Sequence, residues 1–274
     1  MGQSYIPREL SREIREKMQF LVEPKSKGIF RTDLVDLCKL FCQKIRAKAI
    51  EKSAQVHSYK MEHPELIVPF NVPKDKRQIK QGVKCLRNAY AWGEKNFNPE
   101  KFDEEFIKNI ALRITPKLYS QGFADYRKVG VRVAGARVTP PYPEKLQREM
   151  GFFIESLKEQ FKCQDIINRI EIAIYAHLHF ERIHPFIDGN GRTGRTLQDM
   201  ILTFNNTPLP IIETGERQTY YNLLGQAIYD WKYEKQSGGI THGATEGERL
   251  FYTFMAGKIN SSLDKLLNCI GNKL

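Results

Sequence analysis

Apolar residues recur at helical spacing along most of this chain, and this periodicity restricts it to a mainly α-helical fold. The longest such run lies between Ile166 and Glu181. Alternating apolar residues between Ile172 and Phe180 would also fit a strand, but a pattern of this length favours a helix. We expect helices at about residues 10–21, 33–53, 75–92, 103–118, 144–161, 165–182, 191–204, 213–231 and 246–267.

One short segment, residues 123–138, breaks this pattern. Three valines alternate with a glycine and an arginine between Val129 and Val133, Gly135 suits a turn, and prolines follow from Pro140. Alternation of this kind, bounded by turn residues, predicts a short β-hairpin in an otherwise helical protein.

The charge of the chain points to anionic partners. Among its 274 residues, 43 Lys and Arg stand against 32 Asp and Glu, which gives a net charge of +11. Such a surface favours nucleic acid, nucleotides, an acidic protein or a membrane face. Lys76, Lys80, Lys84 and Arg87 follow helical spacing, so they form a basic stripe that is either a docking surface or a solvated helix face.

The sequence shows no membrane or secretion signal. It has no run of eighteen apolar residues and no apolar stretch near Met1, so we expect neither a transmembrane helix nor a signal peptide. The five cysteines form no CxxC pair, as in a reduced, cytosolic protein. We therefore expect a protein without a membrane partner that acts in the cytoplasm or after delivery into another cell.

The twelve residues from His184 to Arg195, His-Pro-Phe-Ile-Asp-Gly-Asn-Gly-Arg-Thr-Gly-Arg, combine the groups of a phosphate-binding site. Glycines let backbone N–H groups approach an anion closely, above all where they open a helix. Arginine forks suit phosphate oxygens, and Asp188 is a hard oxygen ligand of the kind that Mg²⁺ prefers beside phosphates. His184 has no phosphate-binding task and can act as a base.

Three other kinds of site compete for these residues. Gly189–Gly194 fits GxGxxG, but no βαβ pattern surrounds it, which argues against a dinucleotide fold. A Walker loop is excluded because no Gly-Lys-Ser/Thr follows. His177, His179 and His184 lack a thiolate or carboxylate at a zinc-site spacing. We expect His177 to be a buried, hydrogen-bonded histidine.

The same twelve residues resemble the signature of the Fic family, His-x-Phe-x-Asp/Glu-Gly-Asn-Gly-Arg-x-x-Arg, at every fixed position. The Phe123–Arg127 segment, the valine hairpin and Thr139-Pro140-Pro141 resemble its lead-in and target-binding flap, and Tyr220-Tyr221 resembles its nucleotide-side helix. The resemblance covers about residues 98–270. It implies a Fic fold, a helical bundle with one short β-hairpin flap, and transfer of AMP from ATP to a protein hydroxyl.

The resemblance also implies roles for single residues. His184 would be the catalytic base, Asp188 would hold Mg²⁺ at the α- and β-phosphates, and Arg195 would reach the terminal phosphate. Phe186 would anchor the loop from inside. The nucleotide-side set is Phe186, Gly189, Asn190, Gly191, Arg192, Thr193, Gly194, Arg195, Tyr220 and Tyr221. The flap, whose backbone could pair with an extended target segment, comprises Val131, Arg132, Val133, Ala134 and Gly135.

An inhibitory helix is a further implication. Many Fic proteins carry Ser/Thr-x-x-x-Glu-Gly/Asn, whose glutamate pairs with the second arginine of the signature. Residues 47–53 resemble this motif at their Ala-Ile-Glu centre but depart from it at both ends. Glu51 is therefore either a brake on Arg195 or a surface glutamate, and a shifted alignment leaves no brake. A brake at 245–247 is disfavoured because His242 takes the Ser/Thr position.

We predict a protein adenylyltransferase with an N-terminal helical arm at 1–30, a helical region at 31–97 that contains the candidate inhibitory helix, and a Fic core at 98–274. ATP is the expected substrate and Mg²⁺ the expected cofactor. The expected partner is a protein with an exposed Ser, Thr or Tyr hydroxyl, which includes the enzyme itself, and a homodimer is left open.

Ile228 stands where close relatives have an adenine-contacting Asn. One alternative is therefore transfer of another nucleotide or phosphate group, or removal of AMP. The other is a non-catalytic basic adaptor for nucleic acid or acidic protein.

Overall fold

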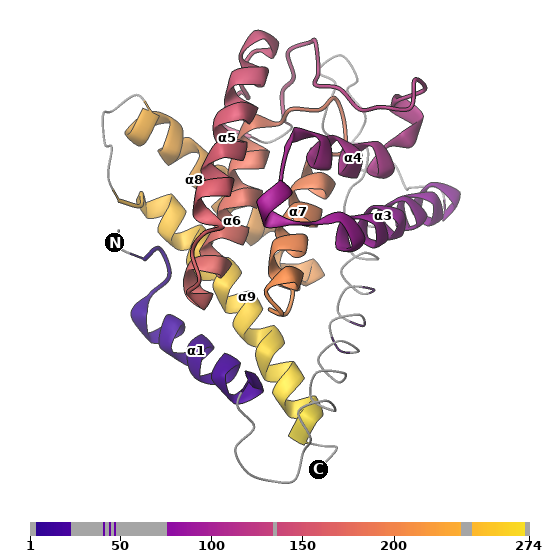
Figure 1. The fold of residues 1–274 in the computed structure, drawn as a ribbon. Helices are drawn as coiled ribbons and strands as arrows, with labels where there is room; N and C mark the ends of the chain where they lie inside the picture. The colour runs from indigo at the N-terminus through magenta and orange to yellow at the C-terminus, as the bar shows by residue number, and fades with distance from the viewer. Residues whose placement is uncertain are drawn as a thin grey trace. The chain divides into compact units, whose positions relative to one another are not determined.

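The described part of the chain is helical. The computed structural model describes residues 4–22, 41, 44, 47, 76–133, 136–236 and 243–271, and within these it contains no strand (Figure 1). The α-helices are α1 (Arg8–Val22), α3 (Lys76–Asn96), α4 (Glu104–Ile114), α5 (Leu146–Gln160), α6 (Ile166–Ile183), α7 (Asn190–Phe204), α8 (Arg217–Asp230) and α9 (Glu246–Gly271). Short 3₁₀ turns are η1 (Pro99–Lys101), η2 (Pro116–Leu118), η3 (Pro143–Lys145) and η4 (Thr214–Glu216), and η5 (Trp231–Gln236) is π-helical.

The helices follow the periodicity of the sequence. The segment that could also have formed a strand is the helix α6, so the choice made on length is confirmed. α4 ends at Ile114, two residues before Pro116, because proline has no N–H to donate and disfavours helical geometry in the residue before it. The helix predicted at 33–53 lies outside the described residues, apart from three of its positions.

The predicted β-hairpin was wrong for the described residues 123–133 and 136–138, which form no strand. Residues two apart share one face of a strand, yet Val131 is 4% exposed and Val129 51%. The guanidinium of Arg127 gives one reason for the absence of a strand. It donates to the backbone oxygens of Val129 (2.9 Å) and Pro141 (2.6 Å). A side chain thus occupies carbonyls that strand pairing would use.

The chain forms two compact units. Unit 1 contains residues 1–49, 164–171 and 205–274. In it α1 and α8 pack on the long helix α9. The Nζ of Lys17 in α1 lies 2.5 Å from the carboxylate of Asp264 in α9. The backbone N–H groups of Tyr5 and Ile6 donate to Glu171, which ties the segment before α1 into the same unit.

Unit 2 contains residues 50–163 and 172–204, and α3, α4 and α7 pack together in it. The rings of four phenylalanines lie 5.5–6.2 Å from the ring of Phe97 between centroids; these are Phe102, Phe106, Phe161 and Phe204. Phe102 also contacts the rings of Phe106 and Phe161. Tyr90 of α3 donates a buried hydrogen bond to Asp199 of α7. This packing fixes α7, whose first residues carry the predicted site.

Candidate active site

His184 is held in a strained and buried position immediately after α6. Its N–H still donates to the oxygen of Phe180, 2.9 Å away, in the manner of a last helical turn. Its φ of 51° lies in the left-handed region, which a non-glycine residue adopts only where its surroundings enforce it. The side chain is 3% exposed. The backbone therefore turns sharply at the predicted base.

Two buried side chains enforce this turn. Asn190 accepts from the N–H of Phe186 (2.9 Å) and donates to the oxygen of the same residue (2.7 Å). Arg127 donates from Nε to the oxygen of His184 (2.8 Å), and its own N–H donates to the oxygen of Pro185 (2.9 Å). Four hydrogen bonds thus hold the three residues that carry and follow the imidazole.

Phe186 and Gly189 fit the loop onto the rest of unit 2. Phe186 is fully buried, as expected, and its ring lies 5.7 Å from that of Tyr126 and 6.1 Å from that of Phe180. Gly189 has a φ of +85°, and a Cβ there would lie 3.0 Å from a methyl carbon of Thr115. The positive φ thus favours glycine at this position, and a side chain there would also crowd Thr115.

The groups predicted to hold phosphates gather at the N-terminus of α7. The N–H of Thr193 donates to the oxygen of Gly189, so the helix begins directly after the glycine turn. The first N–H groups of a helix lack intrahelical acceptors and attract anions. Arg192 Nη2 lies 3.0 Å from Asp188 Oδ1, and the Asp188 side chain is 36% exposed. Thr193 and Gly194 are buried, and Arg195 is half-buried.

Two acid–base groups in α6 lie against this helix start. His177 is buried, as expected, and burial together with the charge of Arg195 lowers its pKa to about 3, so it is neutral at physiological pH. Glu181 lies with Oε2 3.6 Å from His184 Nδ1. Burial raises the pKa of Glu181, while His184 and Arg195 oppose that rise. Burial lowers the pKa of His184, and Glu181 opposes that fall.

Arg127 and Glu181 were not predicted as site residues from the sequence, although Arg127 contacts the backbone of His184 and Glu181 its ring. Glu181 could have been found, because a carboxylate three residues before a histidine lies on the same helix face. Arg127 had no such local signal, since 57 residues separate it from its partner.

Other predicted site residues lie elsewhere or outside the described part. Tyr220 is 3% exposed and its ring lies 5.1 Å from that of Tyr221 and 6.1 Å from that of Phe251, all within unit 1. In the flap, Val131 is buried and Arg132 exposed, while Ala134 and Gly135 lie outside the described residues. Glu51 and the rest of the predicted inhibitory motif after Ala47 also lie outside them.

The disfavoured second brake, at residues 245–247, is a helix start. The N–H of Thr245 donates to Glu248 (2.8 Å), and the N–H of Glu248 donates to Thr245 Oγ1 (3.2 Å), which is a capping box at α9. The Gly247 N–H donates to Asp230 (2.8 Å), and a Cβ there would lie 2.6 Å from the same carboxylate. The glycine is thus explained by close packing at the start of α9.

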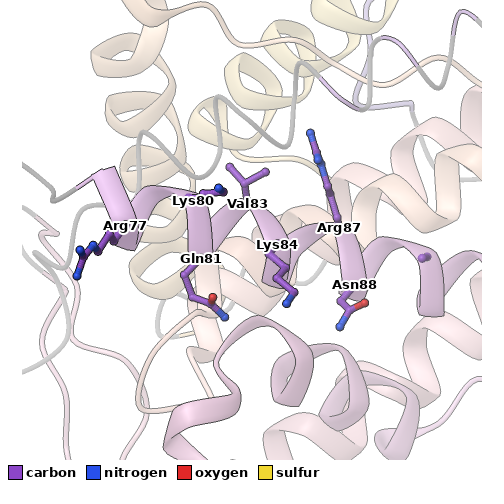
Figure 2. A pocket seen from close by; sticks show the side chains of 8 residues that line it. Arg77, Lys80, Gln81, Val83, Lys84, Arg87 and Asn88 are labelled. Atoms are coloured by element: carbon purple, nitrogen blue, oxygen red, sulfur yellow. The ribbon is translucent and has the colours of Figure 1, made fainter.

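The basic stripe predicted from the sequence lies along α3. A groove of about 710 Å³ is lined by Arg77, Lys80, Gln81, Val83, Lys84, Arg87, Asn88 and Ala91 (Figure 2). Figure 2 shows Lys80, Val83 and Arg87 along one edge of the helix and Gln81, Lys84 and Asn88 along the other. Lys80, Lys84 and Arg87 are exposed, so α3 presents a strongly cationic surface.

The described residues contain no group of three or more His, Cys, Asp or Glu side chains placed to hold a metal ion. A single carboxylate such as Asp188 still fits Mg²⁺, which is commonly held by one or two carboxylates together with substrate phosphates and water. None of the described helices combines the length and apolar character needed to cross a membrane.

The fold and the loop define a helical domain in which a buried histidine precedes a glycine-flanked, arginine-bearing helix N-terminus. Residues 101–202 match the model of the Fic/DOC family. The chain therefore carries a Fic/DOC-family domain, and the signature that suggested this from the sequence lies inside the matched range.

Several relatives share this domain. The chain is 42% identical over 88 residues to a protein adenylyltransferase Fic of Nematostella vectensis, an alignment that covers 32% of this chain and 20% of that protein. It is 31% identical over 159 residues to a probable protein adenylyltransferase of Aquifex aeolicus, covering 56% of this chain and 47% of the relative. The chain thus spans between about a fifth and a half of these two relatives.

Solved structures share the fold over nearly the whole chain. A Fic domain-containing signaling protein of Bacteroides thetaiotaomicron superposes with a TM-score of 0.69 at 16% identity, covering 96% of this chain and 97% of that one. Fic-1 of C. elegans superposes with a TM-score of 0.61 at 18% identity, covering 95% and 71%. At such identities the likeness establishes the fold alone, and that fold is the predicted Fic fold.

Proposed function

We propose that this chain is a protein adenylyltransferase, which transfers AMP from ATP to a Ser, Thr or Tyr hydroxyl of a protein. The observation that carries the proposal is the position of His184, a buried histidine in a loop whose backbone is held by Asn190 and Arg127, shortly before the N-terminus of α7. Relatives named protein adenylyltransferase Fic support the reaction class.

In this reaction His184 accepts one proton, that of the target hydroxyl. The target oxygen attacks the α-phosphorus, a new O–P bond forms, the α–β phosphoanhydride bond breaks, and pyrophosphate leaves. His184 accepts the hydroxyl proton as this bond forms. Because phosphoryl transfer requires little covalent chemistry from the protein, positioning and charge stabilisation provide most of the rate.

Different residues at the start of α7 bind different parts of the triphosphate. The N–H groups after Gly189 and the guanidinium of Arg192 bind its oxygens, and Arg195 reaches the terminal phosphate. Asn190 acts through the shape of the loop, since its amide is engaged on both sides by Phe186. Asp188 would hold Mg²⁺, which neutralises phosphate charge when it is bound.

The remaining predicted roles belong to the same proposal. The flap residues around Val131 would position an extended target segment, Tyr220 and Tyr221 would lie on the nucleotide side, and Glu51 would restrain Arg195. A protein with an exposed hydroxyl, in the cytoplasm or in a cell that receives the enzyme, is the partner.

The test is incorporation of labelled nucleotide. The purified chain is incubated with each nucleoside triphosphate, Mg²⁺ and a lysate, and the added mass and modified side chain are identified by mass spectrometry. We expect AMP on a hydroxyl, and at least a 100-fold loss with His184→Ala, of the order that a general base contributes. A different added group would favour the alternative transfer reactions, to which the substitution of Ile228 for the expected Asn points.

His179→Asn is the matched control for the lost imidazole. His179 lies on α6, 4.2 Å from the ring of Tyr175 between centroids, and contacts Arg182 at 3.3 Å. We expect this variant to retain labelling. Equal labelling by wild type and His184→Ala would refute the role of His184 as the base. No nucleotide-dependent labelling by the wild type, together with salt-sensitive binding to arbitrary DNA, would refute the enzyme assignment and favour the basic adaptor, for which the cationic surface of α3 is the supporting observation.

A further inference from the structure

Glu181 is a buried carboxylate that the proposed reaction does not yet use. Its Oε2 lies 3.6 Å from His184 Nδ1, and its backbone oxygen lies 3.4 Å from the same nitrogen. The side chains of Glu181 and His184 are 11% and 3% exposed. Two oxygens of one residue thus face one ring nitrogen in a site largely closed to water.

The approach of α7 brings the permanent charge of Arg195 close enough to act on Glu181. A Cβ on Gly194 would lie 3.0 Å from His177 Nδ1 and 3.3 Å from Glu181 Oε1, so the glycine lets α7 come close to α6. Burial raises the pKa of the Glu181 carboxyl, and the charges of His184 and of the residue after this glycine, Arg195, oppose that rise. The imidazole, 3.6 Å away, and the positive charge of Arg195 thus both favour the ionised form of this carboxylate.

His184 faces charges of both signs. Arg127, whose Nε lies 2.8 Å from the His184 oxygen, disfavours a positive charge on the ring. Glu181 and Asp188 favour it, and Glu181 has the larger effect of the two carboxylates. A base that must carry a proton during transfer needs this compensation, because burial alone would make the imidazolium costly.

We propose that Glu181 is the positioning residue of His184: its carboxylate keeps the ring proton on Nδ1, leaves Nε2 as the basic nitrogen, and stabilises the imidazolium that forms when Nε2 takes the hydroxyl proton. The catalytic role of this pair rests on the proposed adenylyl transfer. The coupling between carboxylate and ring is a property of the protein without substrate, and it can be measured separately.

The first experiment titrates His184 by NMR in the substrate-free protein. Glu181→Gln keeps the shape and an acceptor oxygen but removes the charge. The midpoint of His184 should move to lower pH by about one unit, the shift expected from losing an opposite charge at this distance. Glu149→Gln is the matched control, because the side chain of Glu149 is similarly little exposed (13%) and pairs with Arg182 at 3.0 Å. It should leave the midpoint unchanged.

The second experiment measures transfer. With Glu181→Gln, kcat should fall about 10- to 100-fold with KM for ATP unchanged, and the acidic limb of the pH profile should move to lower pH with the NMR midpoint. Glu181→Asp, which keeps the charge, should restore the midpoint and part of the rate. Equal midpoints in folded Glu181→Gln and Glu149→Gln overturn the proposal. A shifted midpoint in a protein that transfers no AMP overturns only the proposed function.

Discussion

At the scale of single residues, the loop after α6 shows how a costly conformation is maintained. A non-glycine residue in the left-handed region costs about 1–3 kcal/mol. This cost is offset because Arg127 holds the backbone oxygen of His184 and Asn190 holds the backbone of Phe186, two residues further on. The polar groups of these two side chains are satisfied by carbonyls and N–H groups that the turn would otherwise leave unpaired inside the protein.

His177 should make stability depend on pH. Its pKa is lowered to about 3 in the folded state, against about 6.5 when unfolded. Below pH 6.5 His177 therefore binds a proton in the unfolded chain but not in the folded chain. The free energy of unfolding falls as the pH falls. Between pH 7.5 and 5.5 this residue should account for a loss of about 1.4 kcal/mol.

Urea unfolding of wild type and His177→Gln at these two pH values tests this expectation. Other titrating groups remain in both proteins, so the difference between their pH dependences isolates His177. The variant should lose less stability on acidification. If both proteins lose the same amount, His177 is not buried in its neutral form.

The sequence was sufficient to locate the catalytic loop but not its supports. The residue types between His184 and Arg195 fit one chemistry so narrowly that the loop could be identified without coordinates. Arg127 lies far from it in sequence, and its role depends on tertiary packing that no local pattern reports. Glu181 was counted only as part of a helical stripe, because its distance from the imidazole depends on how the chain turns after α6.

At the scale of helices, two glycines with different surroundings should respond oppositely to the same change. Gly93 of α3 faces α7, and a Cβ there would lie 2.8 Å from the sulfur of Met200. Gly93→Ala should therefore cost about 1–3 kcal/mol through overpacking. Gly151 of α5 has open space at its Cβ position, so Gly151→Ala should gain about 0.5–1 kcal/mol from helix propensity.

The midpoints of chemical unfolding measure both effects in one series. A gain in both variants would mean that α3 and α7 are not packed as closely as described. A loss in both would mean that the space beside Gly151 is filled in solution.

The helices were more predictable than the segment between them. Each helix buries a stripe of its own sequence, and that stripe repeats every turn, so α4 to α9 could be placed to within a few residues. The hairpin prediction depended on alternation over five residues. In the structure, the side chain of Arg127 bonds to carbonyls of this segment and one valine is buried while another is exposed, which the alternation alone could not reveal.

At the scale of the whole molecule, the residues from His184 to Arg195 and their supports belong to unit 2, together with the cationic helix α3. Some of the excess positive charge, +11 over the whole chain, therefore lies in the unit that carries the proposed site. Charge that attracts anions nonspecifically and charge that serves the reaction are separable, because α3 residues such as Lys80 have no part in the proposed transfer.

Removal of two charges from α3 should separate these functions. Lys80→Gln/Lys84→Gln should leave labelling by ATP unchanged, because both side chains are exposed and neither belongs to the loop. Binding to an arbitrary DNA duplex at low salt should weaken, with the slope of log affinity against log salt reduced by about two. Lys158→Gln/Lys162→Gln is the matched control, since each of these lysines pairs with a glutamate three residues before it. An equal change of the salt slope in the two double variants would show that the charge of α3 has no special role in DNA binding. A loss of labelling in the α3 double variant alone would connect this helix to the reaction.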